Sequence, residues 1–185
     1  MPHPLKGVQM TDISDMADAF RTAFRNHPAG VAILTATTET GPVAMTVSSL
    51  ISVSAAPPVI AFSLSNQSAT AAALLTAQTV VIHFPRYEDL DLASLCAQPG
   101  QARFGADHDW ETLPTGEPRY RQIGTWFRGE IQTRLPLEAA TLVTAQLLEG
   151  ACAAATTPHS SETLVYLDRR WRGLGQEGRK TGSPP

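Results

Sequence analysis

The fold is decided by the stretch GPVAMTVSSLISVSAAPP, residues 41–58, which opens with a Gly-Pro pair and ends at a double proline. Its residues are typical of an amphipathic β-strand. The middle of the stretch is crowded with small hydroxyl side chains, namely those of Thr46, Ser48, Ser49, Ser52 and Ser54. Either these groups form a solvated strand face, or they line a groove that binds a polar ligand.

Further β-branched or alternating segments lie on both sides of this stretch. VAILTAT (31–37) precedes it across a Gly-Pro turn, which predicts a hairpin. VIAFSLS (59–65) follows it and alternates, so that one face carries Ile60, Phe62 and Leu64. Other strands are predicted at 79–84, 123–137 and 163–167, whereas residues 139–149 fit either a strand or a helix.

The predicted helices are few and short. The first begins near Asp12 and ends before Pro28, because the residue before a proline avoids the helical region. Its apolar residues recur at steps of three and four and form one face, which consists of Ile13, Met16, Ala17, Phe20 and Phe24. Two shorter helices are predicted, one at 69–77 with Ser68 as its N-cap and one from Leu90 to Cys96.

Six or seven strands with hairpin-like spacing and only short helices predict a mostly β fold, a single antiparallel barrel. A doubly wound sheet would need helices of about 10–15 residues between its strands. We expect the domain to span residues 12–174, with a flexible arm at 1–11 and a disordered tail at 175–185. Residues 98–117 are predicted to form a long surface loop that carries Phe104 and Trp110.

The composition is that of an ordinary globular protein, with 43% hydrophobic and 17% charged residues. A net charge of −3 and the absence of a Lys/Arg cluster argue against binding to nucleic acid or to an anionic membrane. No apolar run approaches the roughly 18 residues of a spanning helix, and no signal peptide is recognisable. Cys96 and Cys152 fit buried small residues of a reducing compartment. We therefore expect a cytoplasmic protein.

The order of the segments favours the ligand groove over the solvated strand. The hydroxyl-rich stretch is followed by an alternating strand and then by Ser68 and Thr70 at the start of a short helix. A helix start with hydroxyl side chains and free backbone N–H groups is a ready site for a phosphate. A ring-binding strand beside a phosphate-binding helix start describes a mononucleotide such as FMN.

The same ordered set of segments resembles the flavin reductase-like family of FMN-binding split barrels. The segments that carry the resemblance follow Phe24 and are HPAGVAILT (27–35), GPVAMTVSSLISVS (41–54), PPVIAFSLS (57–65), SAT (68–70), VVIHFP (80–85), ARFGADHDWETLPTG (102–116) and YLDRRWRGL (166–174). The resemblance covers roughly residues 18 to 174. It implies a Greek-key split barrel of six or seven antiparallel strands with short flanking helices.

The resemblance also implies a cofactor site that draws on many segments. The isoalloxazine ring of the flavin would be lined by Thr46, Val47, Ser48 and Ser49. The ribityl chain would meet Ser63, Ser65 and Asn66, and the phosphate would be held by Ser68 and Thr70. The remaining members, expected near the ring or the phosphate, are His83, Phe84, Phe104 and Trp171. Proteins of this family are similar in being homodimers, with each flavin near the subunit interface.

The activity that the resemblance implies is reduction of flavin by NAD(P)H, with the reduced flavin passed to a partner monooxygenase. FMN is the expected cofactor, with FAD as the other option. No catalytic residue is predicted, because the chemistry belongs to the cofactor. One segment departs from the family pattern, since Glu138 and Ala140 stand where many members carry a Gly-x-His segment. The alternative is therefore an FMN-binding protein that does not turn over nicotinamide.

Three further features each allow two interpretations. His83, inside an apolar strand, is either a hydrogen-bonded structural residue or a contact to the edge of the ring. The arginines at 169, 170 and 172 either cover apolar surface with their stems or supply a guanidinium to a phosphate. The segment Asp107-His108-Asp109 is interpreted as a solvated turn, so no metal site is predicted.

Overall fold

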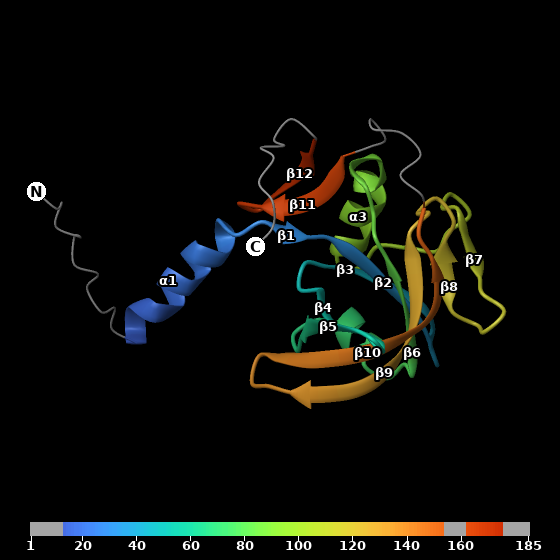
Figure 1. The fold of residues 1–185 in the computed structure, drawn as a ribbon, viewed down its shortest axis with the longest axis horizontal. Coiled ribbons are helices and arrows are strands. Elements are labelled where there is room, and N and C mark those ends of the chain that lie inside the picture. The colour runs from blue at the N-terminus through green and yellow to red at the C-terminus, as the bar shows by residue number, and fades with distance from the viewer. Residues whose placement is uncertain (1–12, 154–161, 176–185) are drawn as a thin grey trace, which may run out of the picture.

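The structure is a computed structural model that describes residues 13–153 and 162–175. Its main element is a seven-stranded antiparallel sheet with the strand order β3-β2-β6-β9-β10-β5-β4, curled into a barrel (Figure 1). The strands of this sheet are β2 (Ala32–Thr38), β3 (Gly41–Val47), β4 (Ile51–Ala55), β5 (Pro58–Ser65), β6 (Thr79–His83), β9 (Trp126–Pro136) and β10 (Ala140–Ala151). The predicted mostly β, antiparallel barrel is therefore confirmed.

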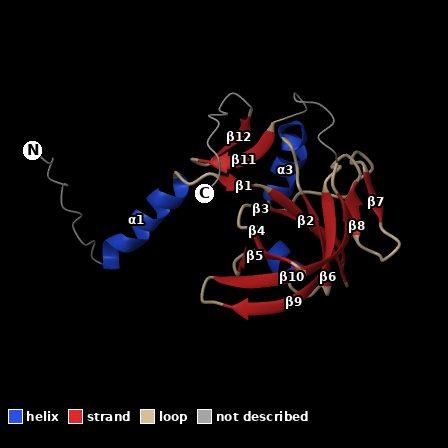
Figure 2. Cartoon of the chain, viewed as in Figure 1, coloured by secondary structure: helices blue, strands red, loops and turns tan. Residues whose placement is uncertain are grey.

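Two smaller sheets and four helical segments complete the described fold (Figure 2). The smaller sheets are built from β1 (Ala29–Gly30), β11 (Thr163–Leu167) and β12 (Arg170–Leu174), and from β7 (Trp110–Thr112) and β8 (Pro118–Tyr120). The helical segments are α1 (Ile13–Arg25), α2 (Ala69–Leu74), the single turn η1 (Tyr87–Asp89) and α3 (Leu90–Ala97). The predicted arm at 1–11 and all but the first residue of the predicted tail lie outside the described residues.

The hydroxyl-rich stretch is not one strand, which corrects the sequence-based prediction. It divides into β3 and β4, which lie at opposite edges of the sheet order. The link between them bends at Ser48 and is held by Ser49, whose hydroxyl group donates to the carbonyl of Ser63 and accepts the Ser63 N–H, each at 3.0 Å. This link therefore fastens the end of β3 to β5 and brings the two edges of the curled sheet together.

Other boundaries follow from local sequence. The segment that fitted either a strand or a helix is strand β10, which pairs with both β5 and β9. The predicted long loop at 98–117 is shortened, because Trp110 begins β7 and pairs with Tyr120 of β8. Phe104 and Trp110 pack against a buried cluster rather than standing in a solvated loop. This region is therefore partly built into the core, contrary to the prediction.

Strand β2 separates two hydrophobic cores because its residues alternate between the faces of the sheet. Leu34 faces the interior of the barrel together with Phe62 and Val143. Ile33 faces the opposite side, where Leu92 of α3 and Tyr120 of β8 complete a second cluster. The α3 helix is thereby fixed against the outer face of β2 and β3, next to the hydroxyl-rich end of β3.

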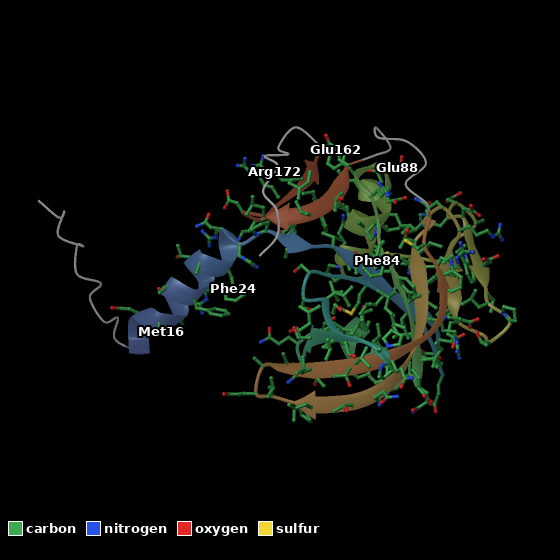
Figure 3. All side chains as sticks on the ribbon, viewed as in Figure 1. Met16, Phe24, Phe84, Glu88, Glu162 and Arg172 are labelled. Carbon is green, nitrogen blue, oxygen red and sulfur yellow. The ribbon has the colours of Figure 1, made fainter. Side chains whose placement is uncertain are left out.

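Helix α1 projects away from the barrel (Figure 1). It begins and ends close to the predicted boundaries, and its amphipathic pattern is confirmed. The predicted apolar face remains open, since Met16, Phe20 and Phe24 are 52%, 57% and 60% exposed. Figure 3 shows Met16 and Phe24 on the projecting helix, away from the barrel. A single short amphipathic helix is marginal in water without packing of its apolar face. The exposed apolar face of α1 is therefore a candidate surface for contact with another protein chain.

Candidate functional site

The hydroxyl side chains selected from the sequence lie around three adjoining hollows. The first, here called the Arg103 pocket, has a volume of about 520 Å³ and is lined by residues that include Thr46, Ser65, Ser68 and Thr70. The second, the bridging hollow, measures about 160 Å³ and is lined by residues that include Thr46, Val47, Ser48 and Trp171. The third, the α1 groove, measures about 750 Å³ and is lined by residues that include Ser48, Ser49 and Ser63. Shared residues place the three hollows in series along the end of β3.

The Arg103 pocket contains a cation that the sequence analysis missed. Nη1 of Arg103 donates to the Thr70 hydroxyl oxygen at 3.2 Å, and Nη2 donates to the Gln98 carbonyl. Nε of Arg103 is buried and has no hydrogen-bond partner among the described residues. A buried donor without an acceptor costs free energy, and the two hydroxyl groups that line the same pocket make it a candidate place for an anion. The only sequence signal was that Arg103 is the single Lys or Arg between Gln98 and Glu117.

The start of α2 supplies the other polar groups of this pocket. Ser68 is the N-cap, as predicted, and its hydroxyl oxygen accepts the Ala71 N–H at 3.2 Å. The Ser68 hydroxyl can still donate its own hydrogen to a ligand. The helix, however, ends at Leu74 instead of the predicted residue 77 and has only six residues. Attraction for an anion in this pocket therefore depends on Arg103 and the hydroxyl groups more than on the dipole of so short a helix.

The bridging hollow lies at the free edge of β3. This strand pairs only with β2, so every second residue directs its backbone N–H and C=O away from the sheet. The Thr46 hydroxyl is not free, because it donates to the Ala93 carbonyl at 2.7 Å and fastens β3 to α3. Trp171 forms a wall of the hollow and meets Tyr166 edge to face at 5.0 Å. Backbone groups of a strand edge beside aromatic walls can accommodate a flat ring with a polar edge.

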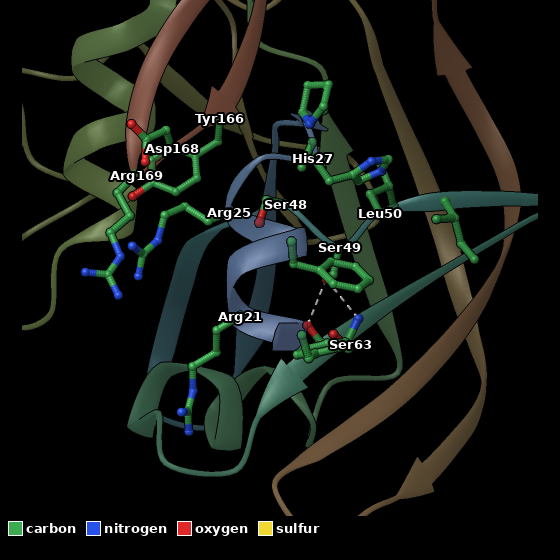
Figure 4. A pocket seen from close by; sticks show the side chains of 16 residues that line it. Arg21, Arg25, His27, Ser48, Ser49, Leu50, Ser63, Tyr166, Asp168 and Arg169 are labelled. Atoms are coloured by element: carbon green, nitrogen blue, oxygen red, sulfur yellow. Dashed lines mark hydrogen bonds between the residues drawn. The ribbon is translucent and has the colours of Figure 1, made fainter. Parts of the chain in front are cut away.

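The α1 groove separates the projecting helix from the barrel. Figure 4 shows Ser49 and Ser63 joined by their hydrogen bonds on one side and the side chains of Arg21, Arg25 and Arg169 on the other. The Ser49 hydroxyl is committed to the backbone of Ser63, so it shapes this wall more than it offers a free group. Ser48 is exposed and lines both this groove and the bridging hollow.

Ser65 lines the Arg103 pocket, whereas its neighbour Asn66 does not. The Asn66 amide nitrogen donates to the Leu137 carbonyl at 2.9 Å, and its oxygen accepts from the Thr141 hydroxyl at 3.1 Å. Asn66 therefore clamps the turn between β9 and β10 and lies outside all three hollows. Ser65 lines the pocket, while its oxygen accepts the Gln67 N–H at 3.3 Å.

The expectation that His83 lies near a ring does not fit the structure. Its side chain is fully buried, Nδ1 donates to the Ile33 carbonyl at 3.1 Å, and Nε2 accepts the Tyr120 N–H at 3.1 Å. Burial is the main reason why the pKa of His83 falls from 6.5 to about 4. The neutral ring therefore joins β6, β2 and β8, and His83 is a structural residue, one of the two interpretations that the sequence left open.

Phe84 and Phe104 also lie outside the three hollows in series. Phe84 borders a separate hollow of about 260 Å³ near β11 and meets Phe127 edge to face at 5.9 Å. Phe104 stacks on Tyr120 with ring centroids 5.4 Å apart and borders a further hollow of about 350 Å³, which adjoins the first through Arg103. Packing of Phe104 therefore serves to position Arg103, its neighbour in the chain.

Comparison with known proteins decides the family. A family model described as the flavin reductase like domain matches residues 24–175, well over half of the chain. The chain belongs to the flavin reductase-like family. This confirms the resemblance carried by the ordered segments.

Individual known proteins are also similar to this chain, in sequence or in fold. The chain is 36% identical over 127 residues to an NADH:FMN oxidoreductase from Rhodococcus qingshengii, which covers 69% of this chain and 66% of that protein. A flavin reductase domain protein from Arthrobacter sp. FB24 is similar in structure, with a TM-score of 0.77, 28% identity and coverage of 85% of this chain and 95% of that one. BorF, the flavin reductase component of a bacterial two-component tryptophan halogenase, shares the fold with a TM-score of 0.74 and 23% identity over 86% of this chain and 98% of that one.

The departure from the flavin reductase-like pattern lies at the turn between β9 and β10. Glu138 is exposed there and its carbonyl accepts from the Asn66 amide at 3.3 Å. Ala140 is directly opposite Ser65 in the sheet. A histidine at this position would therefore stand beside the Arg103 pocket. In this chain position 140 carries only the methyl group of alanine.

The described residues contain neither a metal-binding cluster nor a membrane-spanning helix. Over the described ranges, no three His, Cys, Asp or Glu side chains gather in a way that could hold a metal ion. Asp109 of the Asp-His-Asp segment pairs instead with Arg121 at 3.1 Å. Within residues 13–153 and 162–175, no helix combines the length and the apolar character needed to cross a membrane.

Proposed function

We propose that this protein binds FMN and catalyses the reduction of flavin by NAD(P)H. The observation that carries the proposal is the buried, unpartnered Nε of Arg103 beside the hydroxyl groups of Ser68 and Thr70. A phosphate offers oxygen acceptors to a guanidinium and to both hydroxyl groups, and charge-assisted hydrogen bonds of this kind are strong. Family membership and the oxidoreductase relative support the same activity.

The chemistry and the order of the three hollows suit a flavin mononucleotide. The Arg103 pocket would hold the phosphate, with Ser65 beside the ribityl chain. The bridging hollow would take the ring, with backbone groups of Thr46, Val47 and Ser48 toward its polar edge. Bound flavin supplies the redox chemistry, in which it accepts a hydride from a dihydronicotinamide. The residues of this chain hold and orient the flavin and leave one face open toward the α1 groove.

FMN is the cofactor that we propose, because the cationic end of the site matches a terminal phosphate. The adjoining hollow next to Phe104 would be the continuation available to the adenylate part of FAD. The curated relative is named for NADH and FMN, which supports the same pair for this chain. Titration with FMN and with FAD, followed by quenching of flavin fluorescence, compares the two dissociation constants directly.

The proposed partners are a second copy of the chain and a flavin-dependent monooxygenase. The open apolar face of α1 supports association, because contiguous exposed apolar surface marks interaction sites. The structural neighbour from a two-component halogenase supports a role as the flavin-supplying component. Sedimentation equilibrium of the wild-type protein and of Phe20→Asp tests the first partner, since the variant should dissociate. Unchanged association of that variant would exclude the apolar face of α1 as the contact.

The decisive experiment combines binding and turnover. The purified protein is titrated with FMN, and oxidation of NADH and NADPH is then followed with FMN present. We expect saturable flavin binding and steady oxidation of at least one dinucleotide. Failure to bind either FMN or FAD would end the proposal, whatever the fold.

A second function rests on a specific observation, the alanine at position 140. Because the imidazole that many family members place there is missing, the protein would bind FMN without turning over nicotinamide. This alternative predicts tight flavin binding with no oxidation of NADH or NADPH. The variant Ala140→His sharpens the choice. If the wild-type protein is inactive and the variant oxidises NADH, the flavin carrier is the correct description.

A further inference from the structure

The α1 groove has two chemically different walls. One wall is formed by the end of β3 and by β5, with the small polar residues Ser48 and Ser63 next to the proposed flavin ring. The other consists of the last turns of α1 and the turn between β11 and β12, and it carries Arg21, Arg25 and Arg169 (Figure 4). The rings of Phe20 and Phe24 and the carboxylate of Asp168 line the same side. At about 750 Å³ the groove is large enough for an extended small molecule.

Two of the three arginines of the second wall form no ion pair within the described residues, although the Asp168 carboxylate lines the same groove. Arg25 and Arg169 form no ion pair with any residue in the described part of the chain. Arg21 pairs with Asp18 at 2.6 Å, so its charge is partly offset. The chain as a whole has a net charge of −3. The positive charge on this side of the groove is therefore local and does not reflect the charge of the whole protein. A guanidinium group can donate two parallel hydrogen bonds to two oxygens of one phosphate.

The position of these arginines is fixed by a contact between two distant segments. The backbone N–H of Asp168 donates to the Arg25 carbonyl at 2.8 Å, so the turn after β11 closes the C-terminal end of α1. Asp168 and Arg169 both have positive φ angles, 51° and 57°, in the left-handed region that residues other than glycine rarely adopt. The turn therefore holds Arg169 beside the end of α1, where Arg25 enters the same groove.

We infer that Arg25 and Arg169 bind the pyrophosphate of the nicotinamide dinucleotide and thereby place its nicotinamide toward the flavin side of the α1 groove. The inference rests on the proposed function, because it assigns the dinucleotide half of the same site. The flat, uncharged nicotinamide matches the wall that carries Ser48 and Ser63. The two adjacent phosphates match the wall that carries the arginines. Of the three terminal arginines singled out in the sequence, it selects Arg169, since Arg170 and Arg172 do not line the groove.

The test compares two hydride donors that differ in their phosphates. NADH carries the pyrophosphate, whereas 1-benzyl-1,4-dihydronicotinamide has the same reactive ring and no phosphate. We expect Arg25→Gln and Arg169→Gln each to raise the KM for NADH about tenfold, by loss of charge-assisted hydrogen bonds. Turnover with the phosphate-free donor and the dissociation constant for FMN should stay at the wild-type values. Arg25→Lys and Arg169→Lys, which keep the charge, should recover part of the loss.

Arg170→Gln is the matched control, because Arg170 is an exposed neighbour that lies outside the groove, and its KM for NADH should not change. An unchanged KM for NADH in the double variant Arg25→Gln/Arg169→Gln would overturn the inference. So would an equal loss of activity with both donors, which would point to a disturbed fold or flavin site. A wild-type protein that binds FMN but uses neither donor would instead refute the proposed reductase function.

Discussion

His83 and Arg103 both place polar nitrogen atoms inside the molecule, but their surroundings differ. Around His83, three strands meet, and both ring nitrogens are bonded to backbone groups at 3.1 Å. Around Arg103, a loop meets the start of α2, and Nε is buried without an acceptor. Buried polar groups in native proteins are nearly always satisfied. The comparison therefore separates a structural residue, which is complete, from a candidate binding residue, which lacks a partner.

Replacing His83 should give the largest effect, and it should be an effect on stability. His83→Ala removes a buried ring and leaves the Tyr120 N–H and the Ile33 carbonyl without partners. We expect the free energy of unfolding to fall by about 4 kcal/mol, from the cavity and the unsatisfied groups together. Chemical denaturation measures this loss. If His83→Ala keeps wild-type stability but loses FMN affinity, the contrast with Arg103 is wrong.

The contribution of His83 to stability should also be visible in the wild-type protein, as a dependence of the free energy of unfolding on pH. The pKa of His83 is lowered from 6.5 to about 4 in the folded protein, mainly by burial, so only the unfolded chain binds the proton between these values. The free energy of unfolding should therefore decrease by roughly 3 kcal/mol as the pH falls from 6.5 to about 4. Denaturation at a series of pH values measures it, and the same pH series on His83→Ala should lack this slope.

Glu117 provides an internal reference for that pH series. Burial opposes its ionisation, but hydrogen bonds from Thr115, Thr79 and Arg128 hold the pKa of Glu117 below the usual value of 4.5. A lowered carboxyl pKa stabilises the fold above 4.5 and loses this contribution as the pH falls through the lowered value. The contribution of His83 to the free energy of unfolding is therefore lost between pH 6.5 and about 4, whereas that of Glu117 is lost only below pH 4.5. A single loss of stability confined to pH values below 4.5 would contradict the assignment of His83.

Replacing Arg103 should weaken ligand binding and spare the fold. Arg103→Met keeps the length of the stem but removes the orphaned Nε and both Nη groups. We expect the affinity for FMN to fall by about 2 to 3 kcal/mol, the upper part of the usual range for a hydrogen bond to a charged group, with little change in the free energy of unfolding. Flavin fluorescence titration and denaturation measure the two quantities. Arg121→Met, in a surface ion pair, is the control for removal of an arginine.

Thr70 should show the same pattern with a smaller magnitude. Thr70→Ala removes one hydroxyl group that Arg103 now contacts, and we expect FMN affinity to fall by about 1.5 kcal/mol. Thr76→Ala is the matched control, because its hydroxyl also lies in the α2 region but donates to the Ala73 carbonyl and lines none of the three hollows. Equal FMN dissociation constants for Thr70→Ala and the wild-type protein would contradict the assignment of the phosphate to this pocket.

Much of the fold could be predicted because it depends on local patterns. The alternation of Ile60, Phe62 and Leu64 defined the buried face of β5, and all three are buried in the structure. Ser68 was recognisable as an N-cap because capping depends on the residue itself and its immediate neighbours. The break of residues 41–58 into two strands was not predictable in this way, since it depends on hydrogen bonds between Ser49 and a residue 14 positions away.

By itself, the sequence determined the antiparallel barrel, the amphipathic helix at the start and a series of small hydroxyl groups in chain order, because periodicity and capping act over a few residues. Only the tertiary structure decided which polar groups are satisfied. It joined His83 to Tyr120 across 37 positions, which makes His83 structural, and brought Arg103 to Thr70 across 33 positions with one donor left over. Whether a polar side chain has a partner is a property of contacts between distant segments, and such contacts leave no periodic pattern in the sequence.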